Sequence, residues 1–178
     1  AWAFPLKESL NIGLGTFINN SPLENQAVNN QVIRSFGFDA FPYKTINKKL
    51  RIWNGLHPIN GDKVLAVGDA ASLCDPFLAE GIRPSLISSF YAAESIDQCL
   101  SGKIDNLNLY TKNINNNWGK SMAWGRRIAQ VFYRFPRTGY QLGVKRKTAP
   151  KRIAQILSGE MGYEDIAKRV IKRLLIKS

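Results

Sequence analysis

Histidine and cysteine are scarce in this 178-residue sequence, which contains one histidine and two cysteines. Cys74 and Cys99 are too few for a disulfide framework, and both fall in segments expected to be buried or helical, so we expect reduced thiols. His57 precedes a proline in a turn-rich segment and is expected to be a loop residue. A single histidine supports neither a His-based metal cluster nor a Ser-His-Asp triad, so no metal site is expected.

Long apolar runs are also absent. No run approaches the roughly 18 residues needed to span a bilayer, and no signal peptide can be read from this N-terminus. With 44% hydrophobic residues, the chain has enough apolar side chains to form a core of its own. We expect a cytoplasmic protein, with attachment to a membrane surface as the alternative.

A dinucleotide-binding motif is the third absence. No Gly-x-Gly-x-x-Gly follows an N-terminal strand, and no acidic residue lies about twenty positions beyond one. The segment Gly13-Leu14-Gly15 is not a substitute, because Thr16 and Phe17 follow it without a third glycine or a helix start. It predicts a strand against which another group packs closely. The sequence also begins without methionine, and we expect it to be the C-terminal portion of a longer protein.

The segment Val64–Ile82 is the most informative part that is present. Its apolar run Val64–Val67 predicts a short central strand, and Gly68 predicts a sharp turn after that strand. Asp69 would then lie at the carboxyl end of the strand, where an acid can accept hydrogen bonds from sugar-like hydroxyl groups. Gly81 is expected to open a helix whose free amides stabilise negative charge. Helix capping by Asp69 is the alternative interpretation.

Three elements of this segment resemble a known flavin-binding motif. They are Gly68-Asp69-Ala70-Ala71, a proline seven residues after the aspartate, and Glu80-Gly81-Ile82. Together they are similar to the second flavin-binding motif of FAD-dependent oxidoreductases of the hydroxybenzoate-hydroxylase fold, and more narrowly to that of the geranylgeranyl reductase family. The resemblance implies cofactor-binding roles for Gly68, Asp69, Ala70, Pro76, Gly81 and Ile82.

The sequence departs from this family's motif at a few positions. The family usually has glycine directly after Gly-Asp-Ala-Ala, where this chain has Ser72, and a Thr-Gly pair before Glu-Gly-Ile, where it has Leu78-Ala79. Arg83 and Pro84 stand where aromatic residues are common in the family. Larger side chains beside the flavin would narrow the space there, whereas proline is tolerated in the first turn of a helix.

The start of the chain carries a second resemblance to the same family. Strands are expected over Trp2–Phe4 and Leu10–Phe17, joined by a polar turn over Leu6–Ser9. Their aromatic side chains would line an apolar tunnel, with ordinary sheet core as the alternative. The aromatic-Pro segment followed by Gly-x-Gly resembles the family's substrate-domain signature. It implies substrate-binding roles for Trp2, Phe4, Pro5, Gly13 and Gly15.

The resemblance implies an FAD-dependent oxidoreductase that reduces carbon-carbon double bonds of a prenyl, geranylgeranyl-type chain by hydride transfer from reduced flavin. NADPH or ferredoxin would be the electron donor. Asp69 would bind the ribityl or pyrophosphate region, and Gly81-Ile82 would bind the pyrimidine edge of the isoalloxazine. No catalytic residue or proton donor is assigned. A redox role for Cys74 competes with that of an ordinary buried cysteine.

Two other functions stay open at this point. The first is a flavin monooxygenase or halogenase of the same fold, which would consume oxygen with an aromatic substrate. The second is a non-catalytic, truncated binding module, and the missing dinucleotide motif is the one feature that supports it.

Positive charge is concentrated in the last third of the chain. Residues 1–119 hold ten Lys/Arg and ten Asp/Glu, whereas residues 120–178 hold fifteen and three, which accounts for the whole net charge of +12. Apolar spacing predicts helices over Lys120–Phe135, Pro150–Leu157 and from Tyr163 to Leu175. Their basic faces have three interpretations: a solvated surface, contact with an anionic membrane, and, least favoured, binding of nucleic acid.

Strands are expected first along the chain and helices later, including a helix over Leu23–Phe36. This order predicts a mixed α+β and α/β arrangement that forms the C-terminal part of a two-domain FAD-binding flavoprotein. We expect three parts: residues 1–60 as the end of a substrate-binding domain, 61–103 as an FAD-binding strand-turn-helix segment, and 104–178 as a basic helical region.

Overall fold

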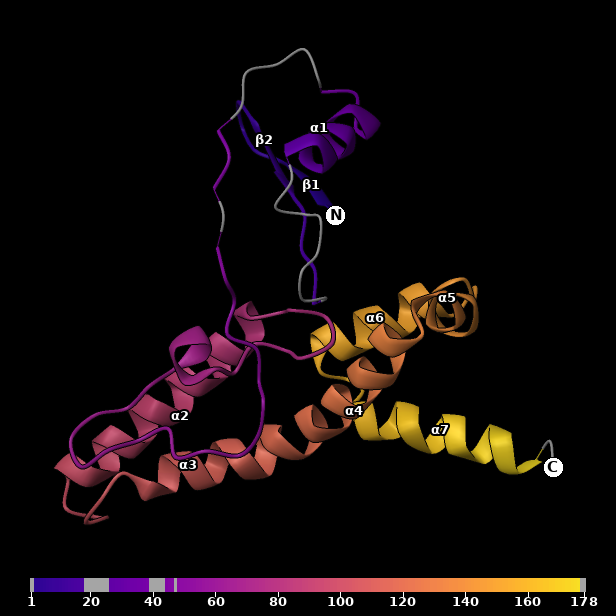
Figure 1. Cartoon of the computed structure of the whole chain (residues 1–178). Coiled ribbons are helices and arrows are strands. Elements are labelled where there is room, and N and C mark those ends of the chain that lie inside the picture. Colours follow the sequence, from indigo (N-terminus) through magenta and orange to yellow (C-terminus); the bar gives the residue numbers. More distant parts are fainter. Residues whose placement is uncertain (1, 18–25, 39–43, 47, 177–178) are drawn as a thin grey trace. The chain divides into compact units, whose positions relative to one another are not determined.

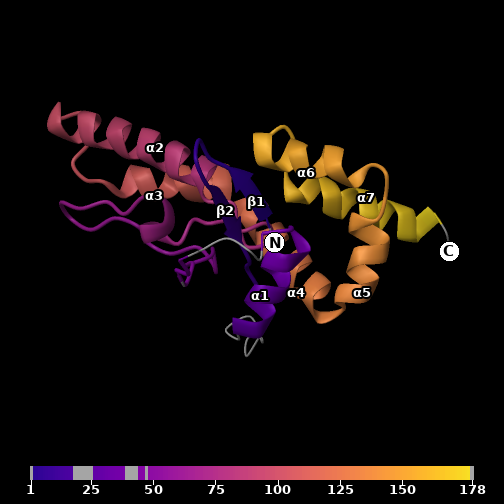
Figure 2. The same cartoon turned by 90° about the horizontal axis from the view of Figure 1, so that it is seen from above.

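The structure is a computed structural model, and it describes residues 2–17, 26–38, 44–46 and 48–176. The chain divides into two units, Ala1–Lys48 and Lys49–Ser178, each of which is described by itself. Figures 1 and 2 show the helices and strands of both units from two directions.

The first unit contains a β-hairpin and one helix. Strands β1 (Trp2–Pro5) and β2 (Leu10–Gly13) pair antiparallel, with Trp2 opposite Gly13, and the Leu6 amide donates to the Ser9 carbonyl at 2.8 Å across the turn. The predicted hairpin and its turn are therefore confirmed. The second strand is shorter than predicted because it ends at Gly13, where its partner strand begins.

Helix α1 (Gln26–Ser35) confirms most of the predicted helix in this unit, whose first residues, 23–25, lie outside the described ranges.

The second unit is built mainly from helices. Helix α2 (Ile82–Leu100) packs beside α3 (Asn108–Ile114), as both Figure 1 and Figure 2 show. A π-helical turn over Asn115–Gly119 joins α3 directly to α4 (Lys120–Arg134). The change in charge between residues 1–119 and 120–178 is therefore not a structural boundary, because helical chain runs through Trp118-Gly119.

The C-terminal region follows the predicted helices closely. Phe135 ends α4 before Pro136, and a short helix, α5 (Pro136–Gly139), follows at once. After a π-helical turn over Tyr140–Val144 come α6 (Ala149–Ser158) and α7 (Tyr163–Ile176). Gly159, at φ +82°, ends α6 in the left-handed conformation that glycine adopts without strain.

The predicted central strand over Val64–Val67 is wrong. Leu65 forms a single isolated bridge with Asn60, and the segment has no further strand pairing within the described residues. Its polar groups are satisfied locally instead: the Ala66 amide donates to the Ile59 carbonyl at 2.9 Å, and the Tyr110 hydroxyl donates to the Ala66 carbonyl at 2.7 Å. The pairing with the short segment around Asn60 is limited to this one bridge, so it does not extend into a strand of a sheet.

One hydrophobic core holds the second unit together. It joins residues before α2 to the helices that follow, and the side chain of Tyr110 is 0% exposed. The buried members of this core are Trp53, Leu73, Ala92, Tyr110, Ile114, Trp118, Met122, Ile156 and Tyr163.

The observed architecture is helical with one small antiparallel sheet, which is an α+β composition. Among the described helices, none has both the length and the apolar character needed to cross a membrane.

Candidate functional site

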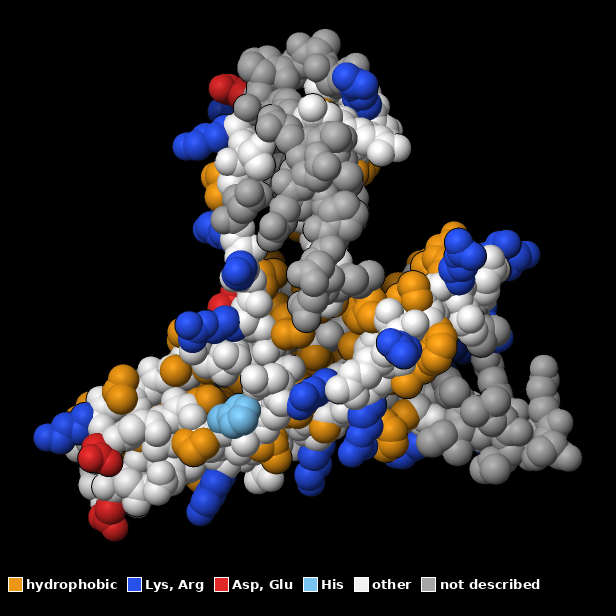
Figure 3. Space-filling view, viewed as in Figure 1, with side chains coloured by type: hydrophobic (Ala, Val, Ile, Leu, Met, Phe, Trp, Pro, Cys, Tyr) orange, Lys and Arg blue, Asp and Glu red, His pale blue; other side chains and the backbone are white. Residues whose placement is uncertain are grey.

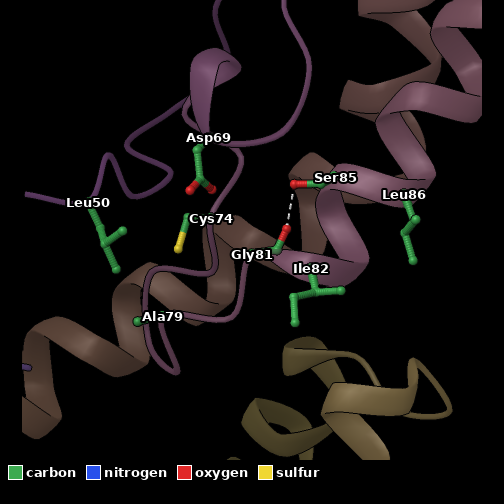
Figure 4. A pocket seen from close by; sticks show the side chains of 8 residues that line it. All are labelled: Leu50, Asp69, Cys74, Ala79, Gly81, Ile82, Ser85 and Leu86. Carbon is green, nitrogen blue, oxygen red and sulfur yellow. Dashed lines mark hydrogen bonds between the residues drawn. The ribbon is translucent and has the colours of Figure 1, made fainter. Parts of the chain in front are cut away.

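A cavity of about 450 Å³ opens at the N-terminus of α2 (Figure 4). Its volume falls within the range of small-molecule sites. Three of the residues predicted to bind a cofactor, Asp69, Gly81 and Ile82, lie together in its wall, although the first is separated from the others by more than ten positions. The complete lining is Leu50, Asp69, Cys74, Ala79, Gly81, Ile82, Ser85 and Leu86.

Gly68 does not line the cavity but packs against α2 next to it. It begins a short 3-10 helix, Gly68–Ala71, with φ at +53°, and its amide donates to the Ser88 hydroxyl at 2.9 Å. A Cβ atom added at Gly68 would contact the Ser85 hydroxyl and lie 3.3 Å from the Ser85 Cα. Only glycine combines this φ with so close an approach to α2.

The N-terminus of α2 presents free amide groups to the cavity. The Arg83 amide is already satisfied, because it donates to Glu80 Oε1 at 2.8 Å, and Pro84 has no amide hydrogen. The amides of Gly81 and Ile82 donate to no acceptor in the part of the chain that the structure describes. They carry the positive end of a 19-residue helix and can donate to a negatively charged or polarised oxygen.

Asp69 places a carboxylate beside these amides. A Cβ atom added at Gly81 would lie 2.9 Å from Asp69 Oδ1, so the two residues approach as closely as a glycine allows. The residue is exposed, and its carboxylate accepts no hydrogen bond from the described residues. The cavity therefore offers an acceptor for hydroxyl groups next to two donors for an anionic oxygen. Figure 4 shows Asp69, Gly81 and Ile82 around this cavity.

Ala70 and Pro76 do not line the cavity. Ala70 is exposed in the 3-10 helix, and Pro76 is buried in a turn between the two halves of the motif. Asp75 shapes that turn, because its Oδ1 accepts hydrogen bonds from the amides of Phe77 and Leu78, each at 2.7 Å. Ala70 and Pro76 therefore belong to the backbone that forms the loop and do not contribute to the cavity surface.

Tyr163 is the main residue of this region that sequence reasoning missed. Its side chain is 0% exposed, and its hydroxyl donates to both carboxylate oxygens of Asp75, at 2.8 and 2.7 Å. Burial, and then the negative charge of Asp75, raise the pKa of the tyrosine well above its usual range. Tyr133 adds a second bond, from its hydroxyl to the Phe77 carbonyl at 2.9 Å. The basic C-terminal region thus holds in place the loop between Asp69 and Gly81.

Arg83 departs from the family's motif and also faces this C-terminal region. Its guanidinium carbon lies 5.1 Å from the centroid of the Trp118 ring, in a cation-π contact, and the group packs against Gly159. Arg83 therefore connects α2 to the end of α6 and takes no part in the cavity wall.

Cys74 lies in the cavity wall as a buried thiol. Burial raises its pKa from 9.0 to about 11, and the nearby carboxylates of Asp69, Asp75 and Glu80 act in the same direction. A redox thiol needs a lowered pKa and positive surroundings. These surroundings favour the interpretation of Cys74 as a structural cysteine, and Cys99 is a free cysteine as well.

We expect Cys74 to be alkylated about 100-fold more slowly in the folded chain than in urea at pH 8, because a pKa about two units higher leaves about 1% as much thiolate. The measurement uses iodoacetamide and mass spectrometry with a Cys99→Ala variant. The raised pKa also stabilises the folded state below pH 9.0, and this contribution is lost as the pH rises towards about 11. Equal alkylation rates in the folded and unfolded chains would contradict the assignment.

The predicted substrate residues lie in the first unit. Trp2 and Phe4 stack with ring centroids 6.4 Å apart, and the Trp2 indole covers Gly13 so closely that a Cβ atom there would clash with the ring. Close packing against this glycine is therefore confirmed. Trp2 is 41% exposed and Phe4 59%, so neither is ordinary buried core within the unit. The substrate-binding roles of Trp2, Phe4, Pro5, Gly13 and Gly15 stay predictions.

Comparison with known proteins gives a distant similarity. No protein-family model matches the chain, and no solved structure matches it. An uncharacterized protein of the archaeon Methanocaldococcus jannaschii is 28% identical over 116 residues, which cover 65% of this chain and 27% of that protein. The chain thus spans about a quarter of the length of this curated relative.

Proposed function

We propose that this chain forms part of an FAD-dependent oxidoreductase that reduces carbon-carbon double bonds of a prenyl chain, as in the geranylgeranyl reductase family it resembles. Two kinds of observation support the proposal. The first is the backbone at the positions where the sequence departs from the motif, and the second is the set of donors and acceptors in the cavity.

The backbone at Ser72 and Ala79 carries the proposal. Within the described ranges these are the two non-glycine residues with positive φ, at 55° and 57°. They are also the two positions where the family motif has glycine and this chain does not. The chain therefore keeps, at both places, a conformation that favours glycine and costs other residues roughly 1–2 kcal/mol. Such agreement is expected if the loop has the course of the flavin-binding motif with its glycines replaced.

The cavity residues fit the flavin that the family uses. Asp69 would accept hydrogen bonds from ribityl hydroxyls, and the free amides of Gly81 and Ile82 would donate to the pyrimidine edge. Gly81 lets the Asp69 carboxylate approach the start of the helix, because a Cβ atom at position 81 would lie 2.9 Å from Asp69 Oδ1. When bound, the flavin supplies the hydride. The residues of this chain hold and orient it, and the positive end of α2 favours negative charge on the ring.

The exposed face of α2 also supports a larger flavin-binding domain. Ile82, Leu86 and Phe90 recur every four residues, and they are 77%, 69% and 68% exposed. Residues four apart lie on one face of a helix, so these side chains form an apolar stripe beside the cavity. In the proposed flavoprotein this stripe packs on the remainder of the nucleotide-binding domain.

The experiment that tests the proposal replaces Asp69 in the full-length product of the gene. Asp69→Ala is expected to lower flavin occupancy on purification about tenfold, since it removes an acceptor to which the cofactor's hydroxyls donate. Asp62→Ala, which removes an exposed carboxylate outside the cavity, is the control and should leave occupancy unchanged. Unchanged flavin content in Asp69→Ala would remove the assignment.

Restoring the two glycines is expected to stabilise the chain. Ser72→Gly and Ala79→Gly each relieve the strain of a left-handed backbone, roughly 1–2 kcal/mol. Part of this stabilisation is offset because glycine has more conformational freedom in the unfolded chain. The double variant should gain about 1 kcal/mol in free energy of unfolding, measured by urea denaturation. Ala70→Gly, within the 3-10 helix that precedes Ser72 and at negative φ, should lower the free energy of unfolding. Loss of stability in the double variant would mean that the loop has another course.

A further inference from the structure

A second cavity, of about 270 Å³, lies between α6 and α7 and shares no residue with the first. Figure 2 allows the two helices to be followed along the C-terminal region. The cavity is small compared with sites for whole cofactors. It is lined by Thr148, Lys151, Arg152, Gln155, Met161 and Arg169.

The polar residues of this cavity are gathered by helix geometry. Thr148, Lys151, Arg152 and Gln155 are spaced by three and four positions and therefore lie on one face at the start of α6. Arg169 comes from α7, and Met161, which is 8% exposed, comes from the loop between the helices. Two separate helices thus direct three cations and two hydrogen-bonding side chains towards one space.

No acidic residue compensates these charges in the cavity wall. Within the described part of the chain, none of the three cations has a recorded ion pair, and Asp165, the acidic residue nearest in sequence to Arg169, accepts from the Gly162 amide at 3.3 Å instead. Three like charges around a small cavity repel one another. On the face that Figure 3 shows, Lys and Arg side chains outnumber Asp and Glu side chains over the helices of the second unit.

We infer that this cavity binds a phosphate or diphosphate group. Arg152 and Arg169 can each donate two parallel hydrogen bonds to phosphate oxygens, Lys151 adds a point charge, and Thr148 and Gln155 supply neutral donors. A volume of about 270 Å³ accommodates the charged group. The inference does not depend on flavin binding at the first cavity.

Such a group can belong to a soluble phosphorylated compound or to the headgroup of an anionic lipid. Both present the same oxygens, and the two sources differ in whether a membrane surface is needed.

The test compares two pairs of substitutions in the same chain. Arg152→Gln with Arg169→Gln removes two cations from the cavity, and Lys168→Gln with Lys172→Gln removes two cations from outside it. Sodium pyrophosphate is titrated calorimetrically at fixed ionic strength, and vesicles of phosphatidylcholine with and without phosphatidic acid are assayed by co-sedimentation. Far-UV circular dichroism verifies that both variants fold.

Saturable binding of pyrophosphate that weakens at least about tenfold in the cavity pair, and little in the outer pair, supports the inference with a soluble ligand. The same pattern seen only with phosphatidic acid vesicles supports it with a lipid headgroup. Equal weakening by both pairs would show attraction to overall charge and would overturn the inference, as would the absence of binding to either probe.

Discussion

Replacing Tyr163 by alanine is expected to lower the free energy of unfolding by roughly 4 kcal/mol or more. Removing a fully buried aromatic side chain costs roughly 3–5 kcal/mol. The same change takes a donor from Asp75, which is 3% exposed and receives the Tyr163 hydroxyl on both carboxylate oxygens. A buried acceptor left without its partner adds roughly 1–3 kcal/mol. Urea denaturation followed by far-UV circular dichroism measures the loss.

Two further variants separate the parts of this effect. Tyr163→Phe keeps the ring against Gly125, where an added Cβ atom would lie only 2.7 Å from the ring, and removes the hydroxyl alone. It should cost roughly 2 kcal/mol. Tyr140→Ala removes a tyrosine that is 52% exposed and should cost under about 1 kcal/mol. If Tyr163→Ala and Tyr140→Ala cost the same, Tyr163 does not join the C-terminal helices to the motif loop.

Replacing Gly68 by alanine is expected to cost roughly 3 kcal/mol. The positive φ contributes roughly 1–2 kcal/mol, and forcing a methyl group against the half-buried Ser85 contributes roughly 1–3 kcal/mol. The Ser85 Cβ would be only 3.0 Å from the new atom, so α2 would have to move away from the 3-10 helix. Because Asp69 and Gly81 sit on these two elements, the cavity between them should widen.

Gly102 provides the matched control for this substitution. It also has a positive φ, +71°, but a Cβ atom added there meets nothing within 4 Å. Gly102→Ala should therefore show the backbone strain alone, roughly 1–2 kcal/mol. The difference between the two variants measures how tightly the motif packs on α2. If Gly68→Ala and Gly102→Ala lower the free energy of unfolding equally, position 68 needs glycine for its positive φ and not for close packing on α2.

The helices of this chain were predictable because their signals are local. α7 begins with acidic residues and repeats apolar side chains at helical spacing, and α6 shows the apolar spacing over a shorter length. Gly81 marks the start of α2 for a similar reason, since the turn before a helix has its own sequence preferences. Each of these patterns is contained within about one element.

The absence of a strand over Val64–Val67 and the bond between Asp75 and Tyr163 were not predictable in the same way. An apolar run of four residues has the composition of a buried strand, yet a strand forms only when another segment supplies a partner. Asp75 and Tyr163 are 88 positions apart, so their contact depends on how the helices pack. The positive φ of Ser72 and Ala79 leaves no trace in composition, because the motif's own glycines are missing there.

The flavin content of the full-length gene product tests the central claim most directly. The proposal predicts that the protein purifies with close to one FAD per chain, seen in its visible absorbance, and that the reduced flavin is reoxidised anaerobically by a prenyl substrate with saturation of a double bond. Purification without flavin and without its recovery on adding FAD would contradict the proposal. If the flavin is reoxidised by oxygen with an aromatic substrate, but not by a prenyl chain, the cofactor assignment holds and the reductase activity is contradicted.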